Sequence, residues 1–110
     1  MSLDVYLYHT ADNRGELYWR KITHNLARMA TATGLYKPLW HPKELGIEFV
    51  EDLSPFLEKG LIKLAGLSEE EIKALSPKNG WGTYDGLLQF TRLYFDACAE
   101  FPDAYVSVSR

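Results

Sequence analysis

The chain is poor in the residues from which metal and disulfide sites are built. Its 110 residues include one cysteine, Cys98, and three histidines. A single cysteine cannot form an internal disulfide, and Cys98 lies on the apolar face of an expected helix, which is typical of a small buried hydrophobe. Zinc sites usually take three or four protein ligands, and the chain has no Cys-x-x-Cys or His-Glu-x-x-His pattern. We therefore expect no metal site and no cofactor.

Runs of positive charge and long apolar stretches are also missing. The formal net charge is −3, and basic residues occur singly or as the pair Arg20-Lys21. Binding of duplex DNA or RNA requires a basic footprint, so we expect no duplex nucleic acid partner. No apolar run approaches the length of a membrane span, and residues 1–10 lack the basic and apolar regions of a signal peptide. These absences predict a cytoplasmic protein without membrane contact.

Signatures of nucleophilic catalysis are absent as well. There is no Gly-x-Ser-x-Gly elbow, and an interior cysteine is a poor thiolate nucleophile. An acid–base set made from His24, His41 and Asp85 would require three separate segments to meet. The pattern favours a protein without catalytic residues, and an enzymatic activity would require His24 and His41 to converge at one cleft.

Aromatic residues, in contrast, are plentiful: three Trp, seven Tyr and five Phe. Large rings bury much area per residue and help a small domain to hold together. The composition is 46% hydrophobic and 25% charged, which is the balance of a globular protein. Because the chain has the length of one ordinary domain, we expect residues 1–110 to form a single globular domain.

Alternating patterns at both ends of the chain predict strands. Residues 3–8 and 104–109 alternate between apolar and polar or aromatic side chains. Residues 17–22 fit either a second strand of an N-terminal hairpin or the start of a helix, and we prefer the strand. Because a lone strand is unstable, the last strand should pair with the N-terminal hairpin.

Helical periodicity and capping residues fill the middle of the chain. The expected helices are residues 24–33 after Thr23, residues 51–65, a short helix after the Ser68 capping box, and residues 84–100 after Thr83. Residues 35–46 contain Pro38 and Pro42, which predict an irregular connection around residues 39–42, with one helical turn at residues 43–45. The fold class is therefore α+β with two layers, in which about four helices pack on a small antiparallel sheet.

The most unusual local pattern places Trp81 between two glycines, directly before an expected helix start. Glycine allows positive φ and close backbone approach, and a helix N-terminus attracts anions. An anionic ligand could stack on Trp81 there. Alternatively, the glycines only form a turn, Trp81 fills the core and Thr83 caps the helix.

Two further segments carry polar groups beside aromatic ones. His24 and Asn25 lie at an expected helix start, and His41 follows Trp40 in an irregular stretch. We hypothesise that these segments and the Trp81 loop meet at one water-accessible hollow that Trp40 and Trp81 help to line. The candidate ligand-binding residues are His24, Asn25, Trp40, His41, Asn79, Trp81, Thr83 and Tyr84.

Several segments together resemble a family of short uncharacterised proteins from bacteria and their phages. They are residues 2–7 (SLDVYL), 22–30 (ITHNL and MA), 39–42 (LWHP), 79–84 (NGWGTY) and 102–110 (PDA, V and VSR). The resemblance covers nearly the whole chain and implies one intact domain. It brings no established activity, so it assigns no functional residue. The phage association implies an accessory or anti-defence role by analogy.

These observations lead to two functional hypotheses. The first is a non-enzymatic binding protein that holds a small polar or anionic, nucleotide-like ligand in an aromatic and amide-lined pocket. The second is a protein–protein adaptor or inhibitor that docks a host defence factor through exposed aromatic side chains. A three-stranded sheet has free edges, and pairing across one of them would form a homodimer.

Overall fold

Both ends of the chain contribute strands to one antiparallel sheet. In the computed structural model, which describes residues 2–110, strands β1 (Ser2–Tyr8), β2 (Glu16–Thr23) and β3 (Tyr105–Ser109) are arranged in the order β2-β1-β3. β1 is central, and its Val5 lies opposite Arg20 of β2 and Val108 of β3. The strands expected at residues 3–8, 17–22 and 104–109 are thereby confirmed, together with their pairing.

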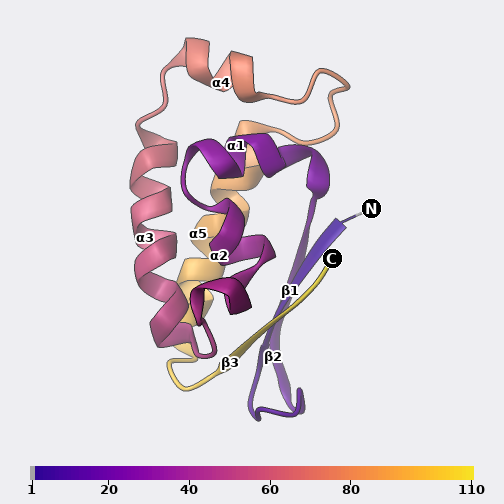
Figure 1. Cartoon of the computed structure of the whole chain (residues 1–110), viewed down its shortest axis with the longest axis vertical. Helices are drawn as coiled ribbons and strands as arrows, with labels where there is room; N and C mark the ends of the chain where they lie inside the picture. The colour runs from indigo at the N-terminus through magenta and orange to yellow at the C-terminus, as the bar shows by residue number, and fades with distance from the viewer. Residues whose placement is uncertain (1) are drawn as a thin grey trace.

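Helices occupy the chain between β2 and β3. They are the 3-10 turn η1 (His24–Leu26), α1 (Ala27–Ala32), α2 (Tyr36–Trp40), the 3-10 turn η2 (Pro42–Leu45), α3 (Val50–Ala65), α4 (Glu69–Leu75) and α5 (Tyr84–Glu100). Figure 1 shows them gathered on one side of the sheet, with α5 between α3 and the strands. The expected two-layer α+β architecture is confirmed. Within residues 2–110, no helix combines the length and apolarity that crossing a membrane requires.

Burial along β1 shows which face of the sheet the helices cover. Leu3, Val5 and Leu7 are completely buried, whereas the alternate side chains are only half-buried. Successive side chains of a strand point to opposite faces, so one face of β1 belongs to the core. α5 supplies the other side of that core, and its Tyr94 is completely buried and stacks on Tyr18 of β2 at a ring distance of 5.9 Å.

The segment that contains Pro38 and Pro42 differs from expectation, because most of it is helical. The turn expected at residues 43–45 is present in η2, but α2 was not predicted. Pro38 is the third residue of α2 and Pro42 is the first residue of η2. In a first helical turn the backbone N–H has no intrahelical acceptor, so a proline there sacrifices no hydrogen bond. Both prolines therefore lie within first helical turns, where they do not break the helix.

Candidate ligand-binding site

Two of the three tryptophans have opposite surroundings. Trp40 is 2% exposed, whereas Trp81 is 71% exposed. The single hollow that both rings were expected to line is therefore not found in the described part of the chain, and the candidate residues divide between two hollows instead. The interpretation of Trp81 as a core residue is also wrong, and that role belongs to Trp40.

We name the two hollows by their position. The indole hollow is lined by Ser2, Lys21, Ile22, Thr23, His24, Asn25, Asn79 and Trp81. The β3 cleft is lined by Trp40, His41, Pro42, Lys43, Glu44, Val106, Ser107, Val108 and Arg110. Four of the candidate residues thus meet in the indole hollow, and two line the β3 cleft.

The loop that carries Trp81 is fixed against the start of η1. Gly82 has a φ of +105°, and a Cβ atom there would lie 2.7 Å from Cγ2 of Thr23 and 3.0 Å from Cγ of Leu26. Only glycine permits both this backbone angle and this close approach. On the other side of the indole, Oδ1 of Asn79 accepts a hydrogen bond of 3.0 Å from the backbone N–H of Trp81. The backbone is thus held on both sides of a ring that stays in solvent.

His24 connects the indole hollow to the core. Its Nδ1 accepts a hydrogen bond of 2.8 Å from Nε1–H of the buried Trp40. Because an indole nitrogen can only donate, Nδ1 must be unprotonated, and a neutral ring then carries its proton on Nε2. Trp40 therefore selects the tautomer in which His24 offers an N–H donor at its other nitrogen.

The remaining polar groups of the indole hollow are mostly donors. Lys21 is exposed and forms no ion pair with any residue in the range 2–110. Asn79 uses its oxygen in the loop, which leaves its NH₂ group available. Asn25 is exposed at the start of η1, where its backbone N–H donates to Oγ1 of Thr23 over 3.2 Å. Among residues 2–110, no carboxylate lines the hollow, so its described lining presents positive charge and N–H groups within an acidic protein.

Thr83 and Tyr84 lie outside both hollows and support the fold. Oγ1 of Thr83 accepts from the backbone N–H of Gly86 at 2.9 Å and caps α5, as the sequence predicted. The hydroxyl of Tyr84 donates to the carbonyl oxygen of Leu64 at 2.7 Å and connects α5 to α3. These two contacts fix the position at which the Trp81 loop enters α5.

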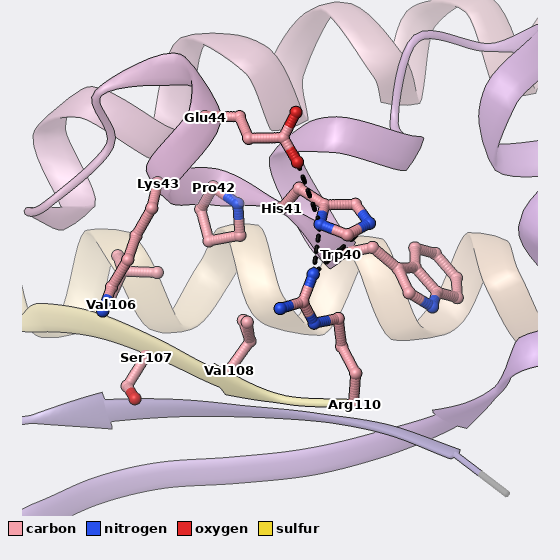
Figure 2. A pocket seen from close by; sticks show the side chains of 9 residues that line it. All are labelled: Trp40, His41, Pro42, Lys43, Glu44, Val106, Ser107, Val108 and Arg110. Carbon is pink, nitrogen blue, oxygen red and sulfur yellow. Dashed lines mark hydrogen bonds and ion pairs between the residues drawn. The ribbon is translucent and has the colours of Figure 1, made fainter.

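The β3 cleft is organised around His41 (Figure 2). The Nδ1 atom of His41 lies 3.1 Å from Oε2 of Glu44 and is also contacted by Nη1 of Arg110, while Nε2 lies 3.2 Å from the hydroxyl of Tyr36. A guanidinium only donates and a carboxylate only accepts. Nδ1 of His41 can donate to Glu44 when it carries a proton, and it can accept from Arg110 when it does not. It therefore pairs with one of these two residues at a time.

The two histidines do not converge on one cleft. His24 lines the indole hollow and His41 lines the β3 cleft. His24 is hydrogen-bonded to Trp40, and His41 is hydrogen-bonded to Tyr36. The Tyr36 and Trp40 rings stack on each other at a ring distance of 5.4 Å. The geometric condition for an acid–base pair of His24 and His41 is therefore not met.

Cys98 is buried, as its position on the apolar face of α5 predicted. Burial raises the pKa of its thiol to about 12, so the reactive thiolate is scarce near neutral pH. Among residues 2–110, no group of three or more His, Cys, Asp or Glu side chains is arranged to hold a metal ion.

Sequence reasoning missed the three cationic residues that line these hollows, Lys21, Lys43 and Arg110. Lys21 was noted only as part of an isolated basic pair, and Arg110 lies 69 positions from its contact His41. No local pattern could have indicated these roles, because they depend on how distant segments dock. Comparison with family models, curated proteins and solved structures finds no match for this chain. The functional argument therefore depends on the geometry of the two hollows.

Proposed function

We propose that this chain is a non-enzymatic binding protein that holds a small planar ligand with an anionic group, of the nucleotide type, in the indole hollow. One observation carries the proposal: Trp81 is 71% exposed although the backbone on both sides of it is fixed. A ring that is already positioned loses little conformational freedom on binding, which is the basis of preorganised recognition.

The chemistry of the hollow favours a flat ligand. An exposed indole offers a stacking surface, and stacking of a nucleobase on an aromatic side chain contributes about 1–3 kcal/mol. Nε2–H of His24 and the amides of Asn25 and Asn79 can pair with the polar edge of such a base. The hollow has a volume of about 860 Å³, which falls within the roughly 300–1,000 Å³ typical of small-molecule sites.

The charge of the hollow favours an anionic substituent on that ligand. Of the lining residues that the structure describes, Lys21 is the one with a fully charged side chain, and none is Asp or Glu. The acidic surface of the protein repels an anionic ligand at most positions. Beside Lys21, a phosphate or carboxylate of the ligand would instead form a direct ion pair. A cytoplasmic accessory protein of bacterial or phage type, as the family resemblance implies, would meet nucleotides in quantity.

Isothermal calorimetry with the whole chain tests this function. The probes are the four ribonucleoside monophosphates, cyclic AMP, adenosine and ribose 5-phosphate. We expect at least one nucleotide to bind, and both adenosine and ribose 5-phosphate to bind more weakly, because each lacks either the anion or the base. Trp81→Ala should lower the affinity roughly 5- to 150-fold, which corresponds to the loss of one stacking contact.

Two control variants make the result specific. Trp19 is 47% exposed on the sheet and does not line the indole hollow, so Trp19→Ala should leave nucleotide affinity unchanged. Lys21→Gln should weaken the nucleotides but not adenosine, while Lys59→Gln on α3 should change neither. The proposal fails if no probe binds at millimolar concentration, or if the Trp19 and Trp81 variants lose affinity equally.

A further inference from the structure

The outer edge of β3 is only partly paired. The backbone N–H of Val106 donates to the carbonyl oxygen of Glu48 over 2.9 Å, on the side of β3 that faces away from β1. Alternate residues of an antiparallel strand direct their N–H and C=O groups to the same side. Val108 therefore presents both its backbone groups on this outer side. Within residues 2–110, no backbone partner occupies them.

Residues 48–50 pair with the first part of this edge, and the chain before them follows a different direction. The backbone N–H of Val50 donates to the carbonyl oxygen of Ala104, and Phe49 forms an antiparallel bridge with Tyr105. Before Glu48, Gly46 adopts a left-handed φ of +72° at the end of η2 and redirects the chain. The edge thus accepts an antiparallel segment near Tyr105 and is left without one at Val108, where the β3 cleft opens.

The β3 cleft is lined by two cationic side chains that form no ion pair with an acidic side chain of residues 2–110. They belong to Lys43 and Arg110. Glu44 is the one acidic lining residue, and its carboxylate lies 3.1 Å from Nδ1 of His41 and 3.8 Å from Nζ of Lys37. Figure 2 shows the Lys43 and Arg110 side chains in the space between β3 and η2.

The size of the cleft distinguishes between kinds of occupant. Its volume is about 210 Å³, which is below the roughly 300–1,000 Å³ of typical small-molecule pockets. Its walls include the apolar side chains of Pro42, Val106 and Val108. A single side chain that enters between the two cations, while its own backbone lies along the strand edge, fits these dimensions better than a whole small molecule.

We infer that the β3 cleft binds an acidic peptide segment in extended conformation, which adds as a strand to the free edge of β3 and places a carboxylate between Lys43 and Arg110. In this mode the main-chain hydrogen bonds to Val108 supply affinity, and the charged side chain supplies specificity. The carboxylate would take the Arg110 guanidinium from His41, because an anion is a stronger acceptor than a neutral ring nitrogen.

Blocked synthetic peptides test this inference with the whole protein. The first probe is the pentapeptide Thr-Glu-Val-Glu-Thr, and the second is its counterpart with lysine in place of glutamate. Two further probes are the acidic peptide with backbone N-methyl groups on its odd or on its even residues. Calorimetry should show binding of the acidic peptide and at least tenfold weaker binding of the lysine peptide. One N-methylated form should fail and the other should bind, because only one set of N–H groups faces β3.

Variants of the protein locate the peptide. Val108→Pro removes the free N–H but preserves the pairing of Ser107 and Ser109 with β1, because proline is tolerated where an edge strand faces outward. It should abolish peptide binding without changing nucleotide binding in the indole hollow. Lys43→Gln should weaken the acidic peptide, whereas Lys59→Gln should not. A thermal melt of each variant checks that it is folded.

Three results would overturn the inference. The first is that the acidic peptide fails to bind at millimolar concentration. The second is that the lysine peptide binds as tightly as the acidic peptide. Equal binding of the unmodified peptide and both N-methylated forms would show an anion site without strand pairing. Because Val108→Pro and Trp81→Ala act on separate hollows, failure of the peptide experiment is distinguishable from failure of the nucleotide experiment.

Discussion

Trp40 and Trp81 were both expected to line one hollow, yet their environments are opposite. Trp40 belongs to α2, stacks on Tyr36 and donates to His24, and its ring is almost completely buried. Trp81 lies in a loop whose backbone is pressed against η1 while its ring stays exposed. The Trp40 side chain is thus held by the core, whereas in the Trp81 loop the backbone is held and the side chain is not. We therefore propose that the Trp40 ring serves stability and that the Trp81 ring is available for binding.

The largest expected effect separates the two rings by their contribution to stability. Trp40→Ala should lower the free energy of unfolding by about 3–5 kcal/mol, since it leaves a large cavity in the core. Trp81→Ala should change it by less than about 0.5 kcal/mol, because an exposed side chain makes few buried contacts. Urea denaturation of both variants measures the difference. Equal losses would show that the Trp81 ring is also an anchor.

A smaller effect tests whether the loop backbone is anchored at Gly82. Gly82→Ala should destabilise the protein by about 2–3 kcal/mol, because the strained φ adds to a close contact with Thr23. Gly80 has a φ of +74° but nothing within 4 Å of an added Cβ, so Gly80→Ala should cost only about 1–2 kcal/mol. Differential scanning calorimetry compares the two. If Gly80→Ala is the more harmful change, the contact with η1 does not hold the loop.

The last effect concerns ionisation of groups in the buried interior. Burial raises the pKa of the Cys98 thiol from 9.0 to about 12 and raises the pKa of the Tyr94 hydroxyl well above its usual value. Above pH 9 the unfolded chain releases the thiol proton while the folded chain retains it, so stability falls as pH rises. For one group the slope is at most about 1.4 kcal/mol per pH unit.

Urea denaturation at several alkaline pH values measures this slope. Cys98→Ala removes the thiol and should flatten the decline immediately above pH 9, the ordinary pKa of the group. Tyr94 should still contribute at higher pH. Thiol-reactive dyes should label native protein slowly and unfolded protein quickly. Rapid labelling of the native protein at neutral pH would contradict the burial of Cys98.

Much of the fold is predictable because its signals are local. The Ser68–Glu71 capping box of α4 and the Thr83 cap of α5 are present with the expected hydrogen bonds. The strands follow from period-two patterns in which one face must be buried. α2 was missed because a proline at a helix start and a proline in an irregular loop look alike in sequence. The choice between them depends on packing over the core.

The site was predictable only in its residue types. His24, Asn25, Asn79 and Trp81 do meet in one hollow, but nothing local indicates that Gly82 docks on Thr23 or that Trp40 donates to His24. These contacts join segments that are far apart in the chain. The burial of Trp40 was equally unpredictable, because five-residue α2 is too short to show a helical period.

The most direct test follows the three indole N–H resonances by nuclear magnetic resonance during titration with a nucleotide. Trp81 should shift progressively and saturably, because its ring would stack on the base. The Trp19 resonance, on the sheet and outside the indole hollow, should move little by comparison. A Trp81 resonance that stays fixed at millimolar nucleotide, or that shifts no more than Trp19, would contradict the account.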